Sequence, residues 1–213
     1  MIRAREKKQL QKMLDSGKSE MIAVIGRRRV GKTHLILDFF KGKMDFEFTG
    51  LQKGTKEQQL RNFAYSMKDA QQTDTLGEVP QDWLEAFHQL KEHLEAKPKS
   101  TRKRVVFIDE LPWVATARSG FLTGLSYFWN SHASRKNMIV VICGSAASWM
   151  IKKVIDNKGG LHNRVTLKLF LQPFTLAETE QYFLERKISL SRYQIILLYM
   201  ALGGIPFYLD QVE

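Results

Sequence analysis

The feature that most constrains this chain is a glycine-containing octapeptide near its amino terminus. Residues 26–33 read Gly-Arg-Arg-Arg-Val-Gly-Lys-Thr, which fits the pattern G-x-x-x-x-G-K-[ST]. An apolar run at 21–25 comes directly before it, and apolar residues recur at helical spacing after it until Gly42. The pattern therefore predicts a buried strand, a tight loop and a helix, in the order that forms an anion-binding loop.

The residue types of this loop suit a polyphosphate. Glycines let backbone amides turn inward around an anion, and the amino terminus of the following helix adds its partial positive charge. Lys32 is expected to reach the β- and γ-phosphates, and Thr33 to offer its hydroxyl to Mg²⁺. We therefore predict that nucleotide is bound by Gly26, Arg27, Arg28, Arg29, Val30, Gly31, Lys32 and Thr33.

A second apolar run supplies the acids that such a site needs. Residues 105–108 read Val-Val-Phe-Ile and are followed by Asp109 and Glu110. Asp109 is a hard oxygen ligand for Mg²⁺, directly or through water, and Glu110 is placed to polarise the attacking water as a general base. Acidic pairs also follow strands in ordinary surface turns, but the upstream loop favours the functional interpretation.

A third apolar run, at 139–143, ends at Gly144 and Ser145. If this strand lies between the other two, Ser145 points toward the γ-phosphate and can sense hydrolysis. The alternative is a serine that only caps the helix beginning nearby. Cys143, within the run, is predicted to be a buried structural thiol.

The remaining motif candidates are weaker. The histidines show no spacing typical of metal ligands. The aromatic residues Trp113, Trp129, Trp149, Phe121 and Phe128 are interpreted as packing residues rather than as a base-stacking platform.

Strands alternate with helices along most of the chain, which predicts a parallel sheet covered on both faces. After Pro173 the pattern is helical only, so we expect a core at 1–173 and a small helical subdomain at 174–213. The chain stops in what resembles the opening of a helix, and we expect it to be part of a longer protein. Strands are expected at 21–25, 44–48, 105–108, 139–143 and 165–171, and helices at 55–68, 83–96, 121–132, 148–155, 176–187 and 191–201.

Composition and charge restrict the class of protein further. No apolar run reaches the roughly 18 residues that span a bilayer, and the start lacks a signal-peptide pattern, so a cytoplasmic protein without membrane contact is expected. The net charge of +11 favours polyphosphates or nucleic acid without choosing between them. The basic clusters, such as 97–104, carry no interleaved aromatic stripe, which favours a solvated surface and leaves DNA or RNA binding as the alternative.

Several segments together resemble one family. GRRRVGKT, VVFIDELPW, VVICGSAASWM, LHNRVTLKLFLQPFTLAE and GGIPFYL are similar to the ATPase domain of the archaeal-type ATPases, a family related to the AAA+ and STAND ATPases. The resemblance extends from Arg5 and Glu6 to Pro206. It implies an α/β P-loop NTPase fold with a parallel five-stranded sheet in the order 5-1-4-3-2, flanked by helices, and a small C-terminal helical lid.

The resemblance also implies roles for particular residues. Asp109 and Glu110 match the Walker B pair, Ser145 the sensor, Arg164 an arginine finger that acts on a neighbouring subunit, and Pro206 a lid turn near adenine. Members commonly carry a further C-terminal domain, which we expect the full-length protein to have.

The function expected from these features is a Mg²⁺-dependent ATPase module that couples its nucleotide state to lid movement or to assembly as a homo-oligomer. Two alternatives stay open. A regulatory switch would hydrolyse ATP very slowly, which steady-state phosphate release would reveal. An ATP-regulated nucleic-acid-binding module would show turnover that DNA or RNA stimulates.

Overall fold

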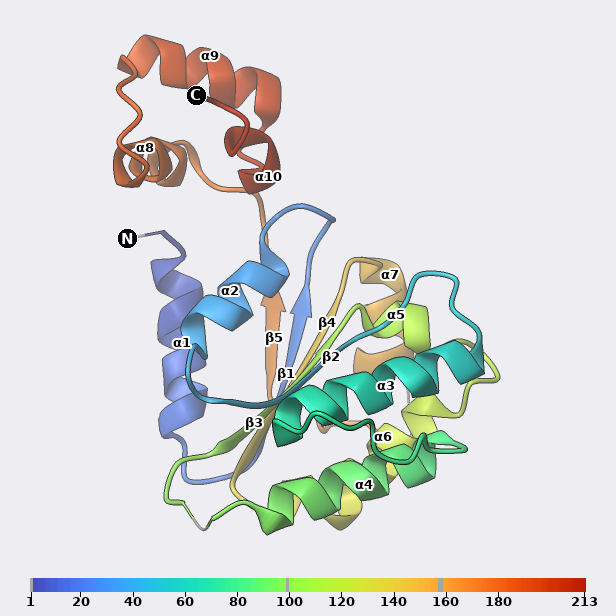
Figure 1. The fold of residues 1–213 in the computed structure, drawn as a ribbon. Helices are drawn as coiled ribbons and strands as arrows, with labels where there is room; N and C mark the ends of the chain where they lie inside the picture. The colour runs from blue at the N-terminus through green and yellow to red at the C-terminus, as the bar shows by residue number, and fades with distance from the viewer. Residues whose placement is uncertain (1, 99, 157–158) are drawn as a thin grey trace.

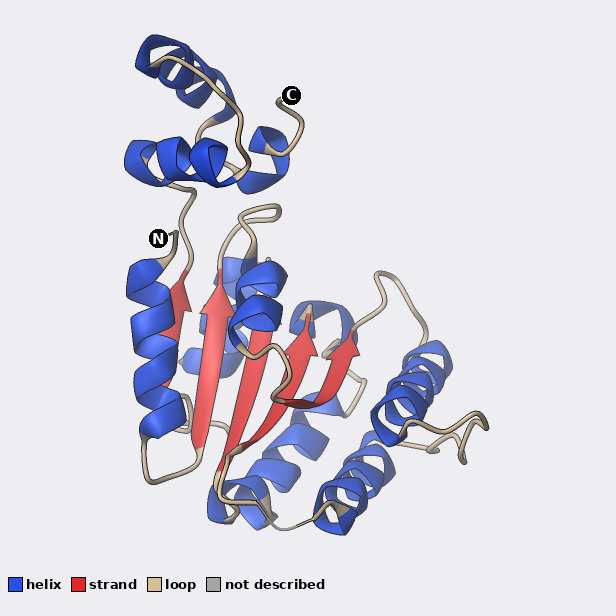
Figure 2. Cartoon of the chain, turned by 60° about the vertical axis from the view of Figure 1, so that its left-hand side comes forward, coloured by secondary structure: helices blue, strands red, loops and turns tan. Residues whose placement is uncertain are grey.

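The short apolar runs of the sequence form the strands of one parallel sheet, and the strands have the predicted order. In the computed structural model, which describes residues 2–98, 100–156 and 159–213, the order is β2-β3-β4-β1-β5, which is 5-1-4-3-2 read from the other edge. All pairings are parallel, so the strands end at a common carboxyl edge, which faces helices α8 to α10 in Figure 2. The strands are β1 (Glu20–Ile25), β2 (Met44–Thr49), β3 (Arg104–Asp109), β4 (Met138–Gly144) and β5 (Leu167–Phe170).

Helices cover both faces of the sheet (Figure 1). β1 and β4 are buried along their whole length, because alternate side chains enter two different cores. Met21 and Ala23 pack on one side, and Ile22 and Val24 on the other. The second side is covered by α1 (Ala4–Asp15) and α2 (Lys32–Phe39), and the first by α3 (Lys56–Gln71), α4 (Trp83–Ala96), α5 (Leu111–Val114), α6 (Phe121–Ser131) and α7 (Ala147–Met150).

The core on the α3, α4 and α6 side is aromatic. Trp83 and Phe121 meet edge to face with ring centroids 4.6 Å apart, and Phe87 stacks on Phe128 at 5.5 Å. Trp129 is buried beside them. The packing interpretation is therefore confirmed for Phe121, Phe128 and Trp129.

The structure departs from the sequence-based expectations at β5, at residues 148–155 and at α1, and it adds the short helices α5 and Ala133–Arg135, which were not predicted. β5 begins at Leu167 rather than at residue 165, and the preceding Thr166 donates its amide to the Met21 carbonyl at 2.8 Å. The segment predicted as one helix at 148–155 is α7 followed by a π-helical turn, Ile151–Ile155. Helix α1 was not predicted, because its sequence is mostly polar and Leu10 is its buried residue.

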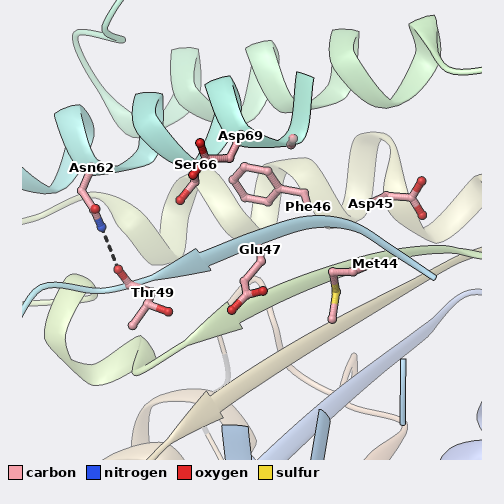
Figure 3. A pocket seen from close by; sticks show the side chains of 9 residues that line it. Met44, Asp45, Phe46, Glu47, Thr49, Asn62, Ser66 and Asp69 are labelled. Carbon is pink, nitrogen blue, oxygen red and sulfur yellow. Dashed lines mark hydrogen bonds between the residues drawn. The ribbon is translucent and has the colours of Figure 1, made fainter. Parts of the chain in front are cut away.

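Strand β2 forms one edge of the sheet, beside a cavity of about 380 Å³ between this strand and α3 (Figure 3). Asn62 of α3 donates to the Thr49 carbonyl at 2.8 Å, as the dashed line shows, and Lys97 donates to the Asp45 carbonyl at 3.2 Å. These contacts satisfy backbone carbonyls on an edge strand and so make pairing with a further strand less favourable.

The Asp45 carboxylate is fully buried and forms ion pairs with three side chains of the basic run at residues 97–104. Arg102 lies 2.8 Å, Arg104 3.1 Å and Lys97 3.4 Å from its oxygens. Burial alone would raise the pKa of Asp45, but hydrogen bonds from Arg102 and a backbone amide, with the charges of Arg102 and Lys97, lower it. Residue 99 of the same run lies outside the described residues. Much of this run therefore serves the fold instead of forming a free basic surface.

The carboxyl-terminal part of the chain is helical and has a small core of its own. It contains α8 (Leu176–Glu185), α9 (Arg192–Leu202) and α10 (Pro206–Leu209), which lie beyond the carboxyl edge of the sheet (Figure 1). Phe183, Ile195 and Leu209 form the centre of this core. In the described part of the chain, no helix has the length and apolar character needed to cross a membrane.

Candidate functional site

The loop at 26–33 connects the carboxyl end of β1 to the amino end of α2. A β-carbon at Gly26 would stand 2.5 Å from the Leu171 carbonyl oxygen, so the backbone approach requires glycine. Gly31 has a φ of 84°, in the left-handed region that favours glycine, and α2 begins at the next residue, Lys32. The loop therefore leads into a helix amino terminus, where unpaired amides and the helix dipole favour an anion.

Thr33 lies against the acid that ends β3. Its Oγ1 donates to Asp109 Oδ2 at 2.5 Å, although the two residues are 76 positions apart in the sequence. The neighbouring Lys32 side chain is buried, and its Nζ donates to the Arg27 carbonyl within the loop at 3.1 Å. The fold thus brings the predicted phosphate-binding lysine and both predicted metal ligands to one place.

This pair of oxygens fits Mg²⁺ bound together with a polyphosphate. Mg²⁺ takes oxygen ligands and usually combines one or two protein groups with phosphate oxygens and water. Over residues 2–98, 100–156 and 159–213, no group of three or more His, Cys, Asp or Glu could hold a metal ion. With one hydroxyl and one carboxylate, Thr33 and Asp109 would hold the ion in concert with a bound nucleotide.

Glu110 is constrained at both its backbone and its side chain. Its φ of 47° and ψ of 48° lie in the left-handed region, which is uncommon for a residue other than glycine. Its Oε2 accepts a hydrogen bond from the Ser145 hydroxyl at 2.9 Å and from the Ser145 amide at 3.3 Å. β4 lies between β1 and β3, and the N-cap of α7 is Ala146. Ser145 therefore binds Glu110 and does not cap α7.

A cavity of about 830 Å³ extends from the loop to the helical part of the chain. Its volume is typical of small-molecule sites. Pro206 lies close to the loop, because its Cγ is 3.8 Å from the position that a β-carbon at Gly31 would occupy. The lining includes Ile2, Arg3, Lys7, Arg28, Arg29, Lys32, Thr33, Glu110, Phe174, Tyr182, Glu185, Pro206, Phe207 and Asp210.

Arg3 is a site residue that the sequence reasoning missed. It is buried, and its guanidinium donates to the Val30 carbonyl of the loop at 3.0 Å and lies 4.7 Å from the Phe174 ring centroid. Its amide donates to Glu178 at 3.0 Å. Burial lowers the pKa of Arg3, and the charges of Glu178 and Glu6 oppose this effect. An arginine in a basic segment carries no local signal of burial, because these partners are 27 and 175 positions away.

Arg164 lies away from this cavity. It precedes β5, near the point where Thr166 bonds to Met21 at the beginning of β1, and it is exposed. The loop at 26–33 follows the other end of β1. Within one chain Arg164 therefore does not meet the loop, and a role in hydrolysis would require a second chain.

Cys143 and its surroundings agree with the prediction of a structural thiol. The side chain is fully buried in β4. Burial raises the pKa of the Cys143 thiol well above its usual value, with a further contribution from the charge of Asp109. The thiol is therefore unsuited to nucleophilic chemistry.

The sheet order, the loop after β1 and the acid at the end of β3 define a P-loop nucleotide-binding fold. More particularly, the chain belongs to the family of ATPase domains found predominantly in Archaea, whose sequence profile matches residues 2–212. An uncharacterized protein of Methanocaldococcus jannaschii is 25% identical over 211 residues, which cover 99% of this chain and 43% of that protein.

Solved structures share the fold at low sequence identity. A Walker-type ATPase of Pyrococcus abyssi is 18% identical with a TM-score of 0.69, over 97% of this chain and 65% of that one. The ORC2 protein of Aeropyrum pernix, solved in ADPNP and ADP complexes, is 14% identical with a TM-score of 0.68, over 98% of this chain and 60% of that one. The chain thus spans less than two thirds of each of these relatives.

Proposed function

We propose that this chain binds ATP with Mg²⁺ at the loop 26–33 and hydrolyses it to ADP and phosphate. The observation that carries the proposal is the contact between Thr33 and Asp109 at 2.5 Å, with Glu110 held nearby by Ser145 at 2.9 Å. These contacts support a metal-binding pair and a candidate base beside the loop that is proposed to receive the polyphosphate.

Each of these side chains has a distinct part in the proposed reaction. Lys32 binds the terminal phosphates, and Thr33 and Asp109 hold Mg²⁺, which when bound neutralises charge on the phosphate oxygens. Glu110 accepts the proton of the attacking water. Ser145 fixes the orientation of the Glu110 carboxylate and is placed to respond when the γ-phosphate leaves.

The part of the cavity beyond the loop suits a nucleoside. Phe174, Tyr182, Pro206 and Phe207 give it apolar and aromatic walls, which are typical of sites for a flat base. The adenine nucleotides bound to the ORC2 protein of Aeropyrum pernix support the choice of an adenine nucleotide.

The helical part of the chain is proposed to act as a lid. Residues 174–213 have their own small core and contribute one wall of the cavity, so their position relative to residues 1–173 would depend on what the cavity holds. Such a dependence would couple the nucleotide state to lid movement, or to assembly of several chains.

The variant Lys32→Ala tests nucleotide binding. Alanine cannot replace a buried cation that faces phosphates, and losing a hydrogen bond to a charged group costs about 10- to 100-fold in affinity. Calorimetric titration with Mg·ATP measures the change, and Lys56→Ala, at an exposed position that begins α3, is the control. Undiminished affinity in Lys32→Ala would exclude the loop as the nucleotide site.

A further inference from the structure

The lid touches the loop through two arginines that differ in burial. Arg3 is 6% exposed and bonds to the Val30 carbonyl, while its ring contact is to Phe174 at the base of the lid. Arg29 belongs to the loop itself and is exposed. The Arg3 contact is costly to break because a buried charge would lose its partners, whereas the Arg29 contact can exchange with solvent or ligand.

Arg29 reaches from the loop to α10. Its Nη1 donates to the Tyr208 hydroxyl at 2.8 Å. Its guanidinium carbon lies 4.4 Å from the Phe207 ring centroid and 5.4 Å from that of Tyr208, so the cation faces both rings. With a φ of 71°, Arg29 has the left-handed backbone conformation, which is uncommon outside glycine.

Charge is divided unevenly around the cavity. Its basic side chains come from the amino-terminal segment, the loop and the start of α2, and include Arg3, Arg29 and Lys32. Among the described residues that line it, the lid contributes the acids Glu185 and Asp210 and no basic side chain. The two cations that join the lid to the loop, Arg3 and Arg29, therefore both come from outside the lid.

Arg29 consequently has two competing targets. One is the neutral aromatic pair of α10, and the other is the anionic ligand that the adjoining loop is proposed to bind. The Tyr208 hydroxyl is uncharged and accepts a single hydrogen bond from Arg29. A phosphate carries the opposite charge and can accept two parallel hydrogen bonds from one guanidinium, so the phosphates are the stronger target.

We propose that Arg29 is a positioning residue that transmits nucleotide binding to the lid. Arg29 holds Phe207 and Tyr208, and phosphates bound at the loop draw it away and release α10. The buried Arg3 contact keeps the base of the lid attached. The release by phosphate rests on the proposed function, whereas the contact with α10 does not.

Distance measurement between two spin labels tests the movement. Tyr65→Cys on α3 and Met200→Cys on α9 provide labelling positions that are 50% and 77% exposed, and the fully buried Cys143 should stay unlabelled. In this background, Mg·ADPNP should shift the distance distribution. Arg29→Gln should show this shifted distance distribution even without nucleotide. Compared with the wild type, its ratio of attached to released lid should be about fivefold to tenfold lower. Arg29→Lys, which keeps the charge, should restore part of the attached population.

Nucleotide affinity supplies a second test, because a residue with a purely structural role would leave this affinity unchanged. Tyr208→Phe removes the hydrogen bond that competes with phosphate, so it should raise the affinity for Mg·ADPNP by about two- to tenfold. The controls Arg61→Gln on α3 and Tyr193→Phe on α9 make the same exchanges at exposed positions. They should match the wild type in the label distance and in the affinity for Mg·ADPNP.

The outcomes separate the lid inference from the proposed function. An Arg29→Gln distribution identical to the wild type without nucleotide would overturn the inference, as would unchanged or weaker binding by Tyr208→Phe. Wild-type chain that binds Mg·ADPNP without any shift in distance would also overturn it while leaving the nucleotide site intact. Absence of ADPNP binding to the wild type would overturn the proposed function, and with it the release by phosphate.

Discussion

At the scale of single residues, Glu110 is the position where structure and chemistry are most closely linked. Its left-handed backbone turns the chain after β3, and Ser145 fixes its carboxylate through two hydrogen bonds. A carboxylate held in this way presents its second oxygen in a defined direction. This is what a general base requires, because proton transfer depends on hydrogen-bond geometry.

The variant Glu110→Gln should separate binding from catalysis. Glutamine keeps the shape and still offers an oxygen to Ser145, but it cannot take a proton. We therefore expect unchanged ATP affinity and a loss of turnover on the order of 10² or more. Calorimetry and steady-state phosphate release measure the two effects, and the exposed Glu57→Gln on α3 is the control. Turnover at the wild-type level would show that Glu110 is not the base.

At the scale of secondary-structure elements, the attachment of edge strand β2 depends on one buried charge. Asp45→Ala would leave Lys97, Arg102 and Arg104 without their common partner. We expect a loss of about 3 kcal/mol in the free energy of unfolding, near the lower end for buried pairs because the basic side chains are partly exposed. Urea unfolding measures it, with the exposed Asp74→Ala as the control. A change no larger than that of Asp74→Ala would contradict this role.

The same carboxylate predicts a dependence of stability on pH. The pKa of Asp45 is lower in the folded chain than its ordinary value of 3.8, because the effect of burial, which raises it, is outweighed by hydrogen bonds from Arg102 and the Val105 amide. The unfolded chain therefore takes up the proton first, so the stabilisation is complete above about pH 4 and is lost as the pH falls through the folded pKa. Asp45→Asn should lose stability less steeply than the wild type below about pH 4. If the free energy of unfolding of Asp45→Asn and of the wild type fell equally with pH, this effect would be contradicted.

At the scale of the whole molecule, Arg164 and the loop lie at opposite ends of the sheet. A finger role is therefore a property of an assembly, in which Arg164 of one chain faces the γ-phosphate bound to another. Guanidinium suits this task because it stays charged and can donate to two phosphoryl oxygens. The alternative is a surface arginine with no part in hydrolysis.

Mixing two variants distinguishes a finger role of Arg164 from a surface arginine without a part in hydrolysis. If Arg164 acts across an interface and the chains exchange, Arg164→Ala mixed with Lys32→Ala forms some interfaces in which an intact loop faces an intact Arg164. ATPase activity that neither variant shows alone should then reappear, at a fraction of the wild-type rate. Full activity of Arg164→Ala by itself, or an ATP-bound chain that stays monomeric, would remove the finger role.

Local sequence patterns were sufficient for much of the fold and for the centre of the site. The loop at 26–33, the strand that ends in Asp109 and helix α4 (Trp83–Ala96) could be predicted because each depends on neighbouring residues: glycine conformation, apolar runs and helical spacing. The order of the strands was not available from periodicity and came from family resemblance. Helix α1 was missed because a mostly polar helix gains its stability from packing on the finished core.

Tertiary structure alone decided which distant residues meet. Asp45 appears in the sequence as one acid among many, and only the pairing of β2 with β3 places it between basic side chains. In the sequence Arg3 looks like a surface cation and Arg29 like a residue of the phosphate-binding loop. The position of the helices after Phe174 gives Arg3 a buried ring contact and Arg29 an aromatic partner. The physical reason is the same for all three. Burial and electrostatic partners are properties of the space around a side chain, and in a folded chain residues far away in the sequence fill that space.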